Sequence, residues 1–231
     1  MTDADLRAID LFAGLDEGSI AAAVDGLETV LVAAGGEFAM SESEAVCCVV
    51  GGGRLALAVI APEERERTIG MLERGDVLVR PIDDWTPAGP PVRCFAIEDS
   101  LLHLVGRDRM ETWMRDPALA SNMVRVLSAQ IADRELAVAI ALEPRVERRL
   151  LLKLRQLAER WGRVTPDGIR LDLRLTHQEL ANMVGAVRES VTIALRRLSD
   201  AGEIEVRNRT LIIRPPRAEP EEKGPTPRRD A

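Results

Sequence analysis

The sequence predicts an α+β protein with three parts: an N-terminal antiparallel β-roll of jelly-roll type, a long helix, and a C-terminal helical module with a hairpin. Three observations lead to this fold class. Short apolar runs separated by turn residues occupy residues 28–105. A stretch with neither Gly nor Pro follows at 118–143. The charge then changes sign: residues 1–143 carry 12 basic and 25 acidic side chains, whereas residues 144–214 carry 15 and 9.

This uneven distribution of charge changes how the net charge of the whole chain should be interpreted. The formal net charge of −7 would by itself argue against a nucleic-acid binder. An acidic body joined to a basic module instead suggests two domains, of which only the second meets an anionic partner. The chain has three cysteines, no apolar run of the roughly 18 residues that a membrane span needs, and no secretion signal at its acidic start. We therefore expect a cytoplasmic protein with no membrane partner and no disulfide framework.

Six short apolar runs are expected to form the strands of the roll. Glycines and a Gly-Asp pair mark the turns between them, and a loop with four prolines interrupts the series at residues 79–92. The runs are Val30–Val32, Val46–Val50, Leu55–Ile60, Thr68–Leu72, Cys94–Ile97 and Leu101–Val105.

The long helix carries apolar side chains on more than one face. One stripe recurs at three- and four-residue steps, and a second register lies beside it. Either the helix packs only on the roll, or its stripe also pairs with the same helix of a second chain. The width of the apolar surface favours the second interpretation. The expected dimer contacts are Val124, Leu127, Ile131 and Val138, and the second register is Met123, Val126, Ala137 and Ile140.

Pro144 ends this helix, and the strongest motif of the chain follows at residues 175–198. Thr176 and Glu179 have the spacing of a capping box. Gly185 stands where a tight turn needs a positive φ, and Ala181 is small enough to let a second helix cross closely. This is the helix-turn-helix pattern.

The second helix of this motif is expected to expose charged side chains, and two short strands at 204–206 and 211–213 then flank a basic tip. Such a hairpin is a wing placed to contact phosphate. The alternative to DNA binding is that the two helices of the motif serve only protein contact. The motif's place in the one basic segment favours DNA binding.

The module resembles the DNA-binding domain of the Crp/Fnr family of bacterial transcription regulators. The order of roll, long helix, hinge and winged helix-turn-helix also resembles that family. The residues in step with the family pattern are Thr176, Gln178, Glu179, Leu180, Ala181, Gly185, Arg188, Glu189, Ser190, Val191, Leu195 and Leu198.

The resemblance implies a division of the chain and a set of partners. We expect a sensor domain over 1–116, a dimerisation helix over 117–143, a DNA-binding domain over 144–214 and a disordered tail over 215–231. It also implies a homodimer on an inverted repeat in double-stranded DNA, with RNA polymerase as a further partner of an activator.

The second helix would enter the major groove. Arg188 is suited to guanine and Glu189 to cytosine, and both are base readers in the family. Thr192, one turn further on, would reach a base or a phosphate. Ile193 stands where the family often has a third base-reading residue, Arg. The DNA half-site of other family members therefore cannot be assigned to this chain. Phosphate contacts are expected from Thr176, His177, Gln178, Ser190, Arg196, Arg207 and Arg209.

The sensor domain lacks the family's cyclic-AMP anchors. After Gly75-Asp76, Arg80 stands about where the ribose-binding Glu should be, and Pro90-Pro91-Val92 replaces the phosphate-binding Arg cassette. Cyclic AMP is therefore not expected, and we predict no cofactor. Gly75, Arg80 and Cys94 mark a weak candidate effector pocket, although a lone loop Arg is more often simply solvated.

Other chemistries have little support. Three cysteines do not supply the four ligands of an iron–sulfur cluster, and Cys47 and Cys48 should point to opposite faces of a strand. Buried, inert thiols are favoured over a redox role with Cys94. His103 is expected to be a core histidine with a satisfied hydrogen bond, with haem ligation the less favoured alternative. The sequence shows no metal-spaced cluster and no catalytic constellation, which argues against an enzyme.

Overall fold

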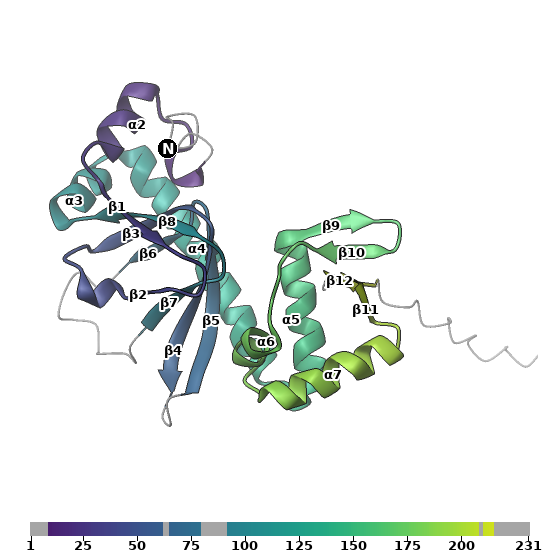
Figure 1. Ribbon diagram of the computed structural model, residues 1–231. Helices are drawn as coiled ribbons and strands as arrows, with labels where there is room; N and C mark the ends of the chain where they lie inside the picture. The colour runs from purple at the N-terminus through teal and green to yellow at the C-terminus, as the bar shows by residue number, and fades with distance from the viewer. Residues whose placement is uncertain (1–8, 62–64, 80–91, 208–209, 215–231) are drawn as a thin grey trace, which may run out of the picture.

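The fold confirms the predicted α+β architecture (Figure 1). The computed structural model describes residues 9–61, 65–79, 92–207 and 210–214. The expected tail, Arg80 and Arg209 lie outside these residues. The roll consists of two four-stranded antiparallel sheets, ordered β1-β8-β3-β6 and β2-β7-β4-β5. Its strands are β1 (Glu28–Val32), β2 (Glu37–Phe38), β3 (Cys47–Gly52), β4 (Arg54–Ala61), β5 (Arg65–Glu73), β6 (Val77–Val79), β7 (Val92–Ala96) and β8 (Ser100–Val105).

The alternation of side chains along β3 divides the roll's interior into two apolar clusters. Cys48 and Val50 lie in the cluster between the two sheets, with Leu57 and Leu102. Cys47 and Val49 belong to a second cluster, which the first sheet forms with the helices that cover it. Adjacent strand residues thus serve opposite faces, as the sequence predicted.

Short helices that the sequence analysis missed build the second cluster. They are the 3-10 turns η1 (Asp10–Phe12) and η2 (Met40–Glu42) and the helices α2 (Glu17–Val24) and α3 (Arg107–Arg115), of which all but η2 contribute to the cluster. Trp113 of α3 anchors them: its ring meets Phe12 edge-on with centroids 5.8 Å apart, and its Nε1 donates to the carbonyl of Ala23 at 3.1 Å. Burial of the indole ring and the hydrogen bond of its N–H both stabilise the fold.

Helix α4 (Pro117–Ala141) runs along the roll with two different faces (Figure 1). Asp116 caps its start by accepting from the N–H groups of Ala118 and Leu119. One face, including Met123, Val126 and Ile140, is buried against the roll and its neighbours. On the other, Val124, Ile131 and Val138 are exposed by 64%, 54% and 62%. Leu127 is partly buried beside the roll cluster.

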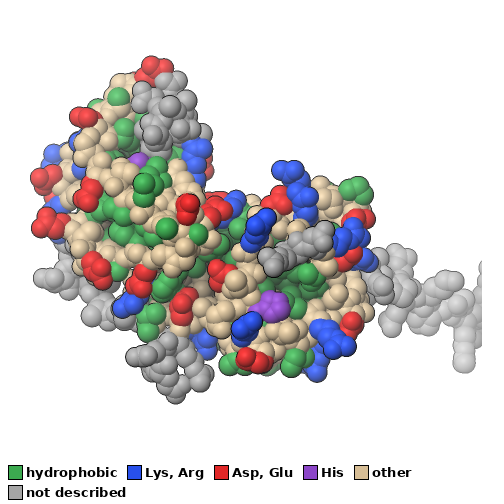
Figure 2. All heavy atoms as spheres, viewed as in Figure 1, with side chains coloured by type: hydrophobic (Ala, Val, Ile, Leu, Met, Phe, Trp, Pro, Cys, Tyr) green, Lys and Arg blue, Asp and Glu red, His purple; other side chains and the backbone are tan. Residues whose placement is uncertain are grey.

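The C-terminal domain packs three helices on a small sheet of order β11-β12-β10-β9. Leu150, Leu154 and Leu157 of the first helix form the centre of its core. The elements are α5 (Val146–Trp161), β9 (Gly162–Thr165), β10 (Gly168–Leu171), α6 (His177–Val184), α7 (Arg188–Asp200), β11 (Ile204–Arg207) and β12 (Thr210–Ile213). Basic side chains gather on this domain, whereas acidic ones are more frequent on the roll (Figure 2).

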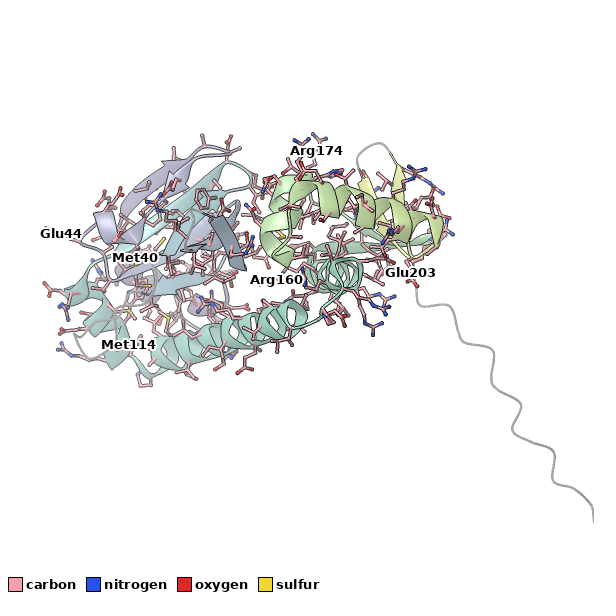
Figure 3. All side chains as sticks on the ribbon, turned by 90° about the horizontal axis from the view of Figure 1, so that it is seen from below. Met40, Glu44, Met114, Arg160, Arg174 and Glu203 are labelled. Atoms are coloured by element: carbon pink, nitrogen blue, oxygen red, sulfur yellow. The ribbon has the colours of Figure 1, made fainter. Side chains whose placement is uncertain are left out.

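Where the two domains meet, one guanidinium, that of Arg160, which Figure 3 labels, holds three carboxylates. Arg160, near the end of α5, donates to Glu73 at 2.6 Å and Asp76 at 2.6 Å, and to Asp133 of α4 at 2.7 Å. The indole of Trp161 also donates to Glu73. Burial works against the charged guanidinium, but Asp76, Glu73 and Asp133 outweigh it and raise the pKa of Arg160. Met71 of β5 adds an apolar contact, because it lies in the C-terminal core cluster.

Replacing the shared cation should weaken this junction. We expect Arg160→Met to lower the free energy of unfolding by about 2–3 kcal/mol, because three carboxylates lose their common partner in a partly buried place. Urea-induced unfolding measures the change. Arg163→Met is the matched control: its side chain is 72% exposed and reaches Asp172 only at 3.6 Å, so its effect should stay below about 0.5 kcal/mol.

The effect of Arg160→Met should also depend on pH. Burial raises the pKa of Asp76, and the guanidinium of Arg160 opposes that rise, so its loss should raise the pKa of this carboxyl further in the folded protein. Carboxyl groups with raised folded-state pKa values destabilise the fold at neutral pH and gain protons as the pH falls. The stability difference from the wild type should therefore shrink between pH 7 and pH 5. A constant difference over that range would contradict the ion-pair explanation.

Candidate DNA interface

The first helix of the motif, α6, begins as the sequence predicts. Thr176 and Glu179 form a capping box, in which the hydroxyl of Thr176 accepts from the N–H of Glu179 at 3.1 Å and the carboxylate of Glu179 accepts from the N–H of Thr176 at 2.5 Å. The Thr176 side chain is thus engaged as a cap. Gln178, beside it, donates to Asn182 at 2.8 Å. Asn182 was not among the predicted site residues.

The turn between α6 and α7 is left-handed at Gly185, with φ 64° and ψ 42°. Glycine tolerates this conformation without the clash that a Cβ introduces. Ala181 is fully buried at the crossing, as are Val191 and Ala194 of α7. These contacts bury one face of α7, so the opposite face is left to solvent.

The exposed face of α7 carries the predicted base readers. Arg188, Glu189 and Thr192 are all exposed. No side chain caps the start of α7, which begins after Val187, so its first N–H groups remain available for an anion. The structure thus brings the candidate readers together on one surface.

Thr192 has partners within the motif. Its hydroxyl donates to the carbonyl of Arg188 at 3.1 Å and lies 2.8 Å from Nδ1 of His177 on α6. The hydroxyl therefore links the two helices, and its methyl group is the part left for a base. Ile193 is 55% exposed on the same helix, which suits contact with a thymine methyl.

The predicted phosphate contacts differ in their surroundings. Arg196 is 86% exposed and reaches Asp200 only at 4.0 Å. Arg207 in the wing is ion-paired: it reaches Asp167 at 2.9 Å and also bonds Glu205. These carboxylates compete with phosphate for its guanidinium. Arg209, at the tip, lies outside the described residues.

A groove of about 640 Å³ between α5 and α7 adds Arg145 and Arg148, which the sequence analysis did not single out. Ser190, one of the predicted phosphate contacts, lines it together with Arg145, Arg148 and Arg197. Arg148 pairs with Glu143 at 3.3 Å and Arg197 with Glu147 at 3.7 Å. The signal in the sequence was the basic run that opens α5.

The candidate effector residues lie apart. Gly75 forms the β5–β6 turn with φ 93°. Cys94 is buried between the sheets, and burial raises the pKa of its thiol to about 12. Burial likewise raises the pKa of Cys47 to about 12 and that of Cys48 still further. Thiols with such pKa values are neutral and poorly reactive at neutral pH, which favours the inert interpretation.

His103 is 8% exposed in the middle of β8. Its Nδ1 lies 3.3 Å from the hydroxyl of Thr29, whereas its buried Nε2 has no partner among the described residues. The Nε2 side lies against Gly51, in space that a Cβ would otherwise fill. Burial lowers the pKa of the imidazole. The ring thus has the close packing of a core histidine and the one hydrogen-bond contact that the sequence analysis expected, while Nε2 has no partner.

Among the described residues, no group of His, Cys, Asp and Glu has the arrangement of a metal site. None of the helices described is both long and apolar enough to cross a membrane.

Known proteins share this arrangement. Residues 145–218 match the Crp-like helix-turn-helix domain. The chain is 25% identical over 210 residues to the CRP-like cAMP-activated global transcriptional regulator of Mycobacterium tuberculosis, covering 90% of this chain and 93% of that one. It is 30% identical over 152 residues to the regulatory protein CysR of Synechococcus elongatus, covering 64% and 66%.

Solved structures agree on the fold. A CooA variant from Carboxydothermus hydrogenoformans superposes with a TM-score of 0.71 at 23% identity, covering 84% of this chain and 86% of that one. A CRP/FNR-family transcriptional regulator from Thermus thermophilus gives 0.59 at 22% identity, covering 80% and 93%. The matched domain and the relatives indicate a DNA-binding transcription regulator with a Crp-like helix-turn-helix domain, and the solved structures show that its fold is similar to that of CRP/FNR-type regulators.

Proposed function

We propose that this regulator acts in the cytoplasm as a homodimer that reads an inverted repeat through α7. The observation that carries the proposal is the exposed face of α7, which presents Arg188 and Glu189 beside an uncapped helix start. Arg188 would donate two hydrogen bonds to guanine, and Glu189 would accept one from cytosine. Where the regulator activates a promoter, RNA polymerase would be its protein partner.

The exposed apolar stripe of α4 supports the dimer. Val124, Ile131 and Val138 lie along one face of a 25-residue helix, while the opposite face is already packed on the roll. A row of exposed large apolar side chains along one helix is a usual contact between subunits. A second copy would cover it by placing the two α4 helices side by side about a two-fold axis, which also sets two copies of α7 one helical turn of DNA apart.

The effector side of the proposal excludes cyclic AMP. The turn residue that follows Gly75, Asp76, is held by Arg160, and the sequence lacks both nucleotide anchors further on. Cyclic-AMP activation is a property of the mycobacterial relative, and we do not extend it to this chain. Ligand binding with a helix-turn-helix used only for protein contact is less well supported, because the basic charge lies on the motif's own domain.

The proposed dimer contact can be tested by placing one charged side chain in the apolar stripe of α4. We expect Ile131→Glu to cost about 2–4 kcal/mol of association free energy, which is roughly 30- to 1,000-fold in Kd, because a carboxylate would be buried at the two-fold axis. Sedimentation velocity of the full chain measures the change. Ala132→Glu is the control, since Ala132 is exposed on the same helix but points away from the stripe. If both variants dissociate equally, the proposed dimer contact along the apolar stripe of α4 is contradicted.

The base readers can be separated from phosphate contacts. For the duplex that the wild type selects from a random pool, Arg188→Ala should reduce discrimination against a substituted guanine by about 1–3 kcal/mol. Arg196→Ala should instead weaken binding to all duplexes alike. It should also reduce the slope of log affinity against log salt concentration by about one, because one phosphate contact is lost. Fluorescence anisotropy at several salt concentrations measures both. The proposed role of Arg188 is wrong if its loss leaves the preference for the selected duplex intact.

A further inference from the structure

A cavity of about 420 Å³ lies between the β5–β6 turn, α4 and the end of α5. It is separate from the exposed face of α7 and from the apolar interior between the two sheets. Asp76 and Gly75 come from the turn, Gln130 and Asp133 from α4, and Arg160 from α5. The walls therefore belong to both domains, at the junction where Figure 3 labels Arg160.

Gln130 is the unusual side chain in this cavity. It is 5% exposed, and neither its amide oxygen nor its amide nitrogen makes a hydrogen bond of ordinary length among the described residues, although the amide lies close enough to Asp76 to lower the pKa of that carboxyl. An unpaired buried polar group costs roughly 1–3 kcal/mol, so such groups in folded proteins usually meet a partner. An amide lining a cavity of this size offers both an acceptor and donors to a bound molecule.

The charges indicate the chemistry of that molecule. On the side of Arg160, one guanidinium is shared by three partly exposed carboxylates, which leaves two negative charges there, and Asp10 and Arg74 add one charge of each sign to the lining. Arg125, also in the lining, is exposed and has no ion pair within the described part of the chain. A positive group is therefore favoured beside the three carboxylates and a negative group at Arg125. Val126 and Ala129 supply the apolar part of the wall.

We propose that this cavity binds a small zwitterion of amino-acid size, with its ammonium group at Gln130 and the carboxylate cluster, and its carboxylate on Arg125. The apolar wall suits a short aliphatic side chain. Because the ligand would contact groups of both domains, its binding would favour the docked arrangement of the DNA-binding domain. The site does not depend on base reading by α7, so its failure and the failure of the proposed function are distinguishable.

Thermal unfolding of the full chain with each of the twenty protein amino acids tests the site. At a concentration about tenfold above Kd, an aliphatic amino acid should raise Tm by about 3–5 °C. Its decarboxylated amine and its deaminated acid should each give less than a third of that shift, because each lacks one of the two charges. Isothermal titration should show one site per chain.

Two variants and a control locate the binding. Gln130→Leu and Arg125→Ala should each abolish the shift, whereas Ser128→Ala, exposed on the same helix, should keep it. If Gln130→Leu impairs folding, Arg125→Ala at the exposed position carries the test. The proposal is overturned if none of the twenty amino acids shifts Tm, or if Arg125→Ala retains the full shift.

Discussion

The close crossing of α6 and α7 is the contact on which the recognition surface depends. Gly185 turns the chain in a left-handed conformation, and Ala181 lets the second helix approach without a cavity. With Val191 and Ala194 committed to this contact, α7 has only one face left for solvent. The composition of that face, with Arg188 and Glu189 at its start, then decides what the helix recognises.

The same logic explains why an acidic protein binds DNA. The basic charge is concentrated on the domain that carries α7, and the excess of acidic charge belongs to the roll (Figure 2). Repulsion between the acidic part and the phosphates lowers non-specific affinity, which otherwise comes almost wholly from backbone electrostatics. Specificity then rests on a few side chains. Several arginines in the module are also paired with carboxylates, as Arg207 is with Asp167, which limits non-specific attraction further.

Local features of the fold could be predicted from the sequence, and distant ones could not. The capping box of Thr176 and the turn at Gly185 depend on residues within one helical turn, and both are as expected. The Arg160 cluster joins residues 27, 84 and 87 positions apart, and no spacing rule connects them. The bond between His177 and Thr192 depends likewise on the helix crossing. Short helices such as α2 were not predicted, because eight residues are too few to show a clear helical period of apolar side chains.

The central claim is that two copies of α7, held by paired α4 helices, read DNA symmetrically. In vitro selection from a random duplex pool tests it most directly. We expect the selected sequences to share an inverted repeat whose half-sites lie about one helical turn apart, roughly 10–10.5 base pairs centre to centre. A single asymmetric site, or no enriched sequence at all, would contradict the account.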